Sequence, residues 1–222
     1  MKNLFSIFDP STSLYFSFNW MSLLFNLILL PMFFWLIPSR LNYFWLLIFY
    51  YLNKEFKILL NKTNFFNSMI LISLFMYILL NNFFSLFPYI FATSSHMTFT
   101  LTLSLLFWLT FMIMSWFKNL NHMFTHLTPQ GTPMILVPLM ILIETTSNLI
   151  RPGTLAVRLS ANIIAGHLII TLISNNAPKL NFNLMILLIF VQYFLFLLEI
   201  MVSIIQAYVF MILTTIYSSE TN

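Results

Sequence analysis

Cysteine is absent from the sequence. Its absence excludes disulfide bonds, iron–sulfur clusters held by thiolates, and catalysis by a thiol nucleophile. Glycine is scarce, with three residues in the whole chain, and no glycine-rich loop is present that could cradle the phosphates of a nucleotide. We therefore expect no nucleotide site, no catalytic residue, no metal site and no cofactor in this chain.

Charged residues are also rare. They make up 6% of the 222 residues, with nine Lys or Arg and five Asp or Glu, whereas a soluble domain carries about a quarter. Hydrophobic residues make up 60%, so polar groups could not cover a water-soluble fold of this length, and lipid must contact much of its surface. The net charge of +4 is spread thinly, without a basic run that could follow a phosphate backbone. We therefore expect no nucleic-acid partner.

The N-terminal residues 1–13 contain Lys2 and Asp9 and no long apolar core. They are typical neither of a secretory signal nor of an arginine-rich transit peptide. The chain is also very hydrophobic and contains 27 Phe and 14 Met. This pattern indicates synthesis inside the organelle or bacterium that uses the protein.

Apolar segments of membrane-spanning length recur along the chain. Helix is the expected structure, because a spanning segment must satisfy its own backbone hydrogen bonds in lipid. We predict one integral membrane domain over residues 1–222, an all-α membrane protein with about five membrane helices and one interfacial helix. The spans are expected at residues 16–37, 65–87, 97–117, 133–174 and 182–217. Residues 41–62 pass from aromatic to lysine-rich, which is typical of an interfacial amphipathic helix; a loop after a short core helix is the alternative.

Residues 119–132 contain Pro129 and Gly131 and are expected to form an exposed loop. This segment also holds His122 and His126, which are four residues apart and could share a metal ion. No third ligand lies nearby in the sequence. A solvated loop without a metal is therefore the prediction.

The last two apolar segments are longer than one membrane crossing requires. Residues 133–174 would form a helix of about 60 Å, and residues 182–217 one of over about 50 Å, against a hydrocarbon core of about 30 Å. Either Pro152 and Gly153 divide the first segment into two short spans, or both helices lie strongly tilted as a long hairpin that turns at residues 175–181. Hydropathy alone separates these alternatives poorly.

On the hairpin alternative, positive charges fall unevenly on the two sides of the membrane. One side receives Arg40, Lys54, Lys57, Lys62 and Lys118, and the other receives Lys2 and Lys179. Loops on the matrix or cytoplasmic side are enriched in Lys and Arg, so the first side is predicted to be that side. The N-terminus would then lie outside and the C-terminus inside.

Some charged residues lie within apolar segments, where an ionised group costs at least about 2.5–3.5 kcal/mol on insertion scales. They are Glu144, Arg151, Arg158 and Glu199. Such residues persist when they pair, line water or act on an ion, so we expect them to be functional. Another helix should approach closely beside Arg158, because small residues follow it at Ser160, Ala161, Ala165 and Gly166.

The polar residues of the last two segments follow helical spacing. Steps of three or four predict one stripe, made of Glu144, Asn148, Arg151, Leu155, Arg158 and Asn162. Steps of seven, with one serine between, predict a second stripe, made of Gln192, Glu199, Ser203 and Gln206. His167 follows Arg158 by nine residues, about half a turn off, and should face away from the first stripe.

The segment 150–167 reads Ile-Arg-Pro-Gly-Thr-Leu-Ala-Val-Arg-Leu-Ser-Ala-Asn-Ile-Ile-Ala-Gly-His. It closely resembles subunit a of F-type ATP synthases in its mitochondrially encoded form, above all in Arg-Leu-x-Ala-Asn-x-x-Ala-Gly-His. Glu144 and the segment from Glu199 to Gln206 also fit. The resemblance implies a non-catalytic proton-translocating subunit of the mitochondrial inner membrane, with its N-terminus toward the intermembrane space and its C-terminus toward the matrix.

The same resemblance implies partners and positions for the polar residues. The last two helices would lie steeply tilted against a ring of c subunits, which favours the hairpin, and Arg158 would face a carboxylate on each passing c subunit. Residues near the ring or the intermembrane-side half-channel would be Asn162, His167, Glu199 and Gln206. Glu144 would belong to the matrix-side half-channel. Further expected partners are the other membrane-sector subunits, the peripheral stalk, and the lipid bilayer, cardiolipin included.

These positions support a hypothesis of two half-channels. A proton enters past His167 and Glu199, neutralises a c-ring carboxylate, and leaves near Glu144 after the ring has rotated. Arg158 stands between the half-channels, where its charge favours the ionised carboxylate and bars direct passage of protons. Arginine suits this position because guanidinium stays protonated where a buried lysine can become neutral.

Structural interpretations stand beside these roles. His167 and Glu199 could form a hydrogen-bonded pair instead of a relay, and Arg151 is expected to pair with Glu144 or to anchor the bend at residues 152–153. Interhelical hydrogen bonds or secondary roles are the alternative for Asn162, Gln192, Ser203 and Gln206.

Two other classes of membrane protein fit the sequence less well. A haem-binding redox subunit would need histidines in facing spans, and only His167 lies well inside a predicted span. A stand-alone transporter would show internal repeats and helices interrupted by Gly and Pro, and no repeat is present.

Overall fold

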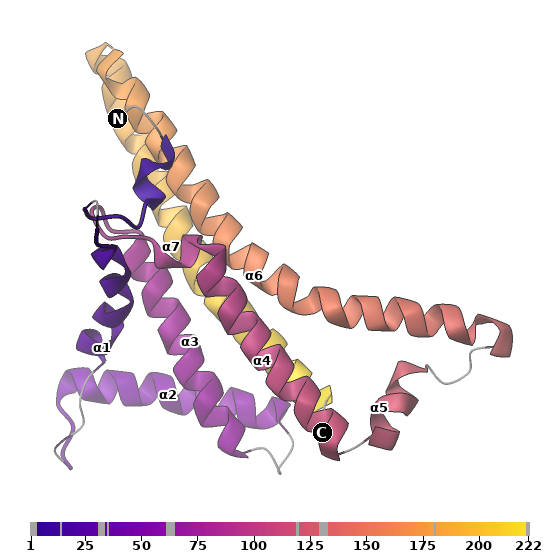
Figure 1. Cartoon of the computed structure of the whole chain (residues 1–222). Helices are drawn as coiled ribbons and strands as arrows, with labels where there is room; N and C mark the ends of the chain where they lie inside the picture. Colours follow the sequence, from indigo (N-terminus) through magenta and orange to yellow (C-terminus); the bar gives the residue numbers. More distant parts are fainter. Residues whose placement is uncertain are drawn as a thin grey trace.

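The structure is a computed structural model that describes residues 4–13, 15–30, 34, 36–60, 65–118, 120–128, 133–179 and 181–220. These residues form helices joined by turns, and no strand occurs among them (Figure 1). The predicted all-α fold is confirmed.

The described chain contains both 3-10 helices and α-helices. The 3-10 helices are η1 (Leu4–Phe8), η2 (Phe18–Leu24), η4 (Thr93–Ser95), η5 (Met134–Leu136) and η6 (Ala177–Lys179). The α-helices are α1 (Phe25–Leu29), α2 (Arg40–Leu59), α3 (Phe65–Ser85), α4 (Met97–Lys118), α5 (Leu120–Leu127), α6 (Val137–Asn176) and α7 (Phe182–Glu220).

Four helical segments of the described chain are long and apolar enough to cross a membrane. They are Ser68–Ser85, Met97–Lys118, Met134–Asn176 and Phe182–Ser219. The predicted first span, residues 16–37, includes residues 31–33 and 35, which lie outside the described residues. Its described part contains η2 and the short α1, so a fifth span stays a prediction.

The membrane helices form a bundle in which α3 packs along α7 and α4 packs along α6. Its apolar core lies where α3, α6 and α7 meet, and α2 contributes Phe56 to it. Buried members of this core include Phe56, Leu71, Ile78, Leu155, Leu159, Phe210 and Met211. On the outside, the first half of α7 exposes large apolar side chains such as Phe190, Phe194 and Leu198. These side chains are left for lipid or for a partner protein.

α2 lies across one end of the bundle instead of along it (Figure 1). Ser39 caps this helix, because its hydroxyl accepts a hydrogen bond from the backbone N–H of Asn42. Phe56 is fully buried, whereas Lys54 and Lys57 are exposed. The helix thus brings positive charge to the end of the bundle where the C-terminus also lies (Figure 1).

α6 is one continuous helix of 40 residues that contains Pro152. Proline has no N–H, so the carbonyl of Asn148 loses its usual helical partner and the helix is free to bend. Figure 1 shows such a bend, with the first part of α6 lying crosswise and the second part rising beside α7. The proline therefore redirects the helix without dividing it, and η6 joins α6 to α7 as a hairpin.

The predicted loop over residues 119–132 is wrong for residues 120–127, which form α5. No Pro or Gly occurs between Leu120 and Leu127, and both breakers follow later, at Pro129 and Gly131. The helix is anchored by an edge-to-face contact between Trp116 and Phe124, whose ring centroids are 5.9 Å apart. The apolar face made by Leu120, Met123, Phe124 and Leu127, with its aromatic contact, thus outweighs the polar character of this segment.

Candidate functional site

The carboxyl group of Glu199 lies directly against α6 at Gly166. A Cβ atom built on Gly166 would stand 2.5 Å from Oε1 of Glu199 and 2.8 Å from its Cδ. Real Cβ atoms do not approach other atoms so closely. The absence of a side chain at Gly166 is therefore what lets the acid of α7 reach the backbone of α6.

A small cavity beside Glu199 gathers polar groups from three helices. Its volume is about 20 Å³, room for roughly one water molecule. The polar residues that line it are Asn82 from α3, Asn162 from α6, and Glu199, Ser203 and Gln206 from α7. The fold therefore brings together four residues that spacing assigned to two separate stripes, Asn162 on one and the α7 residues on the other.

Asn82 is the member of this cavity that sequence analysis missed. Its side chain is 1% exposed, and neither its Nδ2 nor its Oδ1 has a hydrogen-bond partner among the described residues. Buried amide groups are nearly always hydrogen-bonded, to protein or to ordered water. The available signal was the Asn81-Asn82 pair near the end of an otherwise apolar segment.

His167 lines a second, larger hollow of about 530 Å³, here called the His167 hollow. It lies between the N-terminal 3-10 helices, the turn after α3, the C-terminal half of α6 and the N-terminal half of α7. The residues that line it include Asn19, Leu86, Phe91, His167, Thr171 and Phe196. Leu86 also lines the small cavity beside Glu199, here called the Glu199 cavity. The two spaces are therefore neighbours.

The imidazole of His167 is held from two sides. It lies against the backbone of Ser85, and the ring of Phe8 meets it edge to face at 6.2 Å. Its Nε2 atom is buried without a hydrogen-bond partner among the described residues. A direct hydrogen bond from this atom to Glu199 is therefore not formed, and any proton transfer between the two residues needs a bridging group.

Arg158 faces a third space, on another side of α6. This hollow of about 500 Å³ is wide open and is lined by Ile150, Gly153, Thr154, Val157 and Arg158. Arg158 is half-buried and makes no ion pair within the described part of the chain. Neither the His167 hollow nor the Glu199 cavity shares a lining residue with it. The prediction that Arg158 and His167 lie on different sides of this helix agrees with the arrangement.

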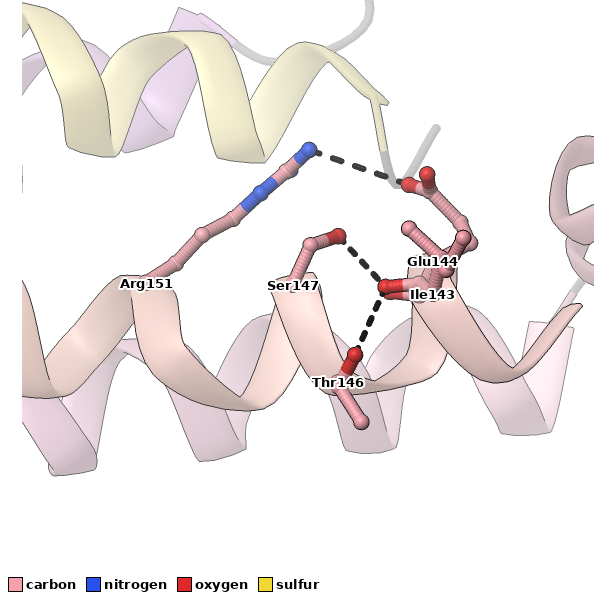
Figure 2. A network of polar contacts seen from close by, with 5 residues as sticks. All are labelled: Ile143, Glu144, Thr146, Ser147 and Arg151. Atoms are coloured by element: carbon pink, nitrogen blue, oxygen red, sulfur yellow. Dashed lines mark hydrogen bonds and ion pairs between the residues drawn. The ribbon is translucent and has the colours of Figure 1, made fainter. Parts of the chain in front are cut away.

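Glu144 and Arg151 form an ion pair on the first part of α6. Nη2 of Arg151 lies 3.9 Å from Oε1 of Glu144 (Figure 2), and the guanidinium also stands 5.2 Å from the ring centroid of Tyr217 on α7. Ser147 and Thr146 donate hydrogen bonds to backbone carbonyls of the same turn. Of the two structural interpretations of Arg151, pairing with Glu144 is the one that the structure shows.

Other candidates stay apart from these groups. Gln192 lies on α7 outside the three spaces just described. Within the described residues, no three His, Cys, Asp or Glu side chains come together to hold a metal ion. The side chains of His122 and His126 lie outside the described ones.

Comparison with known proteins gives a consistent result. The family model described as ATP synthase A chain matches residues 14–219. The chain is 56% identical over 222 residues to the ATP synthase subunit a of Locusta migratoria, with 99% of each chain covered. It is 53% identical over 223 residues to that of Drosophila melanogaster and 52% identical over 225 residues to that of Anopheles gambiae, with 100% of each chain covered.

Proposed function

Because the chain belongs to the ATP synthase A chain family, we propose that its polar groups form the two ends and the barrier of a proton path. Members of this family are the proton-channel subunit of the membrane sector and work beside the ring of c subunits. The protein is accordingly a multi-pass protein of the mitochondrial inner membrane. Three groups of residues divide the task into a barrier, an uptake side and a release side.

Arg158 carries the proposal. It is a half-buried cation on an open, mostly apolar surface of α6, and the described residues offer it no anion. A charge at membrane depth persists only when a counter-charge or water compensates it. The missing anion is supplied from outside the chain, by the carboxylate of each passing c subunit. The guanidinium favours the ionised carboxylate, which drives proton release, and its permanent charge bars protons from crossing directly.

The His167 hollow and the Glu199 cavity form the uptake side of the path. The hollow is open near the N-terminal helices and reaches His167, and Leu86 lines both the hollow and the cavity. His167 and Glu199 are the titratable groups along this route. A water molecule in the cavity, held by Asn82, Asn162 and Gln206, would bridge Glu199 to its neighbours.

Glu144 marks the release side, at the opposite end of the bundle. This end also carries the exposed Lys54 and Lys57 of α2 and the C-terminus of α7. The excess of lysine assigns it to the matrix, with the N-terminus toward the intermembrane space. The same lysines would bind anionic headgroups such as cardiolipin, and the peripheral-stalk subunits would contact the remaining exposed surfaces.

Replacing Gly166 by alanine tests the uptake side. The added methyl group occupies the place of the Glu199 carboxyl, so the acid must swing out of its cavity while the helix itself gains a better helix former. We expect the rate of ATP synthesis per assembled complex to fall about tenfold, which corresponds to about 1.4 kcal/mol on the barrier.

The double variant Gly166→Ala, Glu199→Asp provides the control, because the shorter acid fits beside the methyl group. We expect it to recover part of the lost rate. Full activity of the single Gly166→Ala variant would show that the position of the Glu199 carboxyl against Gly166 does not matter for proton flow.

Replacing Asn82 by leucine tests the third helix of the cavity. Leucine keeps the bulk and removes both unpartnered amide groups, so the fold should tolerate it. We expect passive proton conduction through the membrane sector to fall about tenfold, because the water in the cavity loses its anchor.

Asn81→Leu is the matched control, since Asn81 is buried next to it but does not line the cavity. Its conduction should stay at the level of the unchanged protein. Equal losses of proton conduction in both variants would show that the effect comes from the packing of α3. That result would contradict the role of the Glu199 cavity in proton uptake.

A further inference from the structure

Arg151 is held by two helices at once. On α6 its guanidinium meets Glu144 at 3.9 Å (Figure 2). From α7, the ring centroid of Tyr217 lies 5.2 Å from the guanidinium. Glu144 and Arg151 are seven residues apart, two helical turns, which is beyond the three or four residues over which side chains on one helix normally pair. The long arginine side chain must therefore lie along the helix to reach its acid, and a second contact is needed to keep it there.

Tyr217 is suited to supply this second contact. An arginine within about 6 Å of a ring centroid is attracted to the electron-rich face of the ring. The ring comes from the last turns of α7, far from Arg151 in the sequence. Figure 2 shows Arg151 stretched along α6 toward Glu144 with the end of α7 close by.

We propose that Tyr217 is a positioning residue for the release side of the proton path: it holds Arg151 against Glu144 and so fixes the matrix-side acid in place. The inference rests on the proposed role of Glu144 as the group that takes up the proton leaving the ring. On this proposal, the C-terminal end of α7 has a role on the release side, separate from the role of Glu199 and Gln206, which come earlier in the same helix. The contact also joins the first half of α6 to the last turn of α7.

The test is a double-mutant cycle measured as proton-driven ATP synthesis per assembled complex. Tyr217→Leu removes the ring, and Arg151→Gln removes the cation. Each is expected to lower the rate about two- to fivefold, the range of one cation–π contact. Because Tyr217 acts through Arg151, the double variant should be no slower than Arg151→Gln alone. Tyr217→Phe keeps the aromatic face and should retain the full rate.

A merely structural role gives a different pattern. If Tyr217 only packs α7 against α6, the ring is still needed after Arg151 has gone, and the losses in the double variant multiply. That outcome overturns the proposal, as does an unchanged rate in Tyr217→Leu. The amount of assembled complex, measured separately, keeps loss of folding apart from loss of rate.

Glu144→Gln separates this inference from the function on which it rests. A normal rate in Glu144→Gln contradicts the role of Glu144 itself. A slow Glu144→Gln together with a normal Tyr217→Leu contradicts the positioning role alone.

Discussion

Replacing Arg158 by lysine should reduce proton-driven ATP synthesis to the background rate. Lysine keeps a positive charge in water, but an amine in a poorly solvated site can give up its proton, whereas a guanidinium does not. The surroundings of Arg158 favour that loss, because its hollow is mostly apolar and the described chain provides no acid beside it. A neutral amine would neither favour the ionised ring carboxylate nor repel protons. The measurement is ATP synthesis in inner-membrane vesicles at a fixed proton gradient.

A neutral residue at the same position should fail in a different way. Arg158→Gln removes the barrier altogether, so protons would pass between the two half-channels without turning the ring. One charge crossing 100 mV releases about 2.3 kcal/mol, and several protons are needed per ATP, so a leak of this kind dissipates the gradient. Proton conduction without ATP synthesis is the expected signature. Normal ATP synthesis in Arg158→Lys vesicles would sink the account of the barrier.

Glu199→Gln has the second largest expected effect. Glutamine has nearly the shape of glutamate and keeps the contact with Gly166, but it cannot carry a proton. We expect proton uptake from the intermembrane side, and with it ATP synthesis, to fall about a hundredfold, as for the loss of one proton-transferring group. Glu199→Asp should retain part of the rate, because it keeps the acid and moves it by one methylene group.

Gln192→Leu is the matched control for this effect. Gln192 belongs to the same predicted stripe on α7, one heptad before Glu199, but lines none of the polar spaces. Its replacement should leave the rate unchanged. If Glu199→Gln vesicles synthesise ATP at the normal rate, Glu199 is not part of the proton path and has only a structural role.

Hydropathy was sufficient to predict the four long apolar helices. Residues 65–87 and 97–117 were expected as spans and correspond closely to α3 and α4. The two long segments form α6 and α7. α6 continues through Pro152, because one missing hydrogen bond bends a long helix more readily than it ends the helix. α5 was missed although its apolar residues Leu120, Met123, Phe124 and Leu127 follow the spacing of one helix face. A segment of eight residues is too short to form a stable helix alone, and its contacts with α4 and α6 depend on the finished fold.

The candidate site was predictable within each helix but not between helices. Spacing places Glu199, Ser203 and Gln206 on one face of α7, since that requires only the period of a helix. It says nothing about which helix faces them. The insertion of Asn82 from α3, the seat of Glu199 on Gly166, and the reach of Tyr217 to Arg151 all depend on how distant segments pack. These contacts therefore had to come from the structure.

The most direct measurement of the central claim is a crosslink from the Arg158 face to the ring. The chain has no cysteine of its own, so single cysteines can be placed at Thr154 or Val157, which line the Arg158 hollow and are exposed. A second cysteine is placed beside the carboxylate of the c subunit. Leu106 on α4, also exposed, serves as the control position. Disulfides between a and c subunits should form from residues 154 and 157 and not from residue 106; assembled complexes that link to the ring only from residue 106 would place Arg158 away from the rotor and contradict the account.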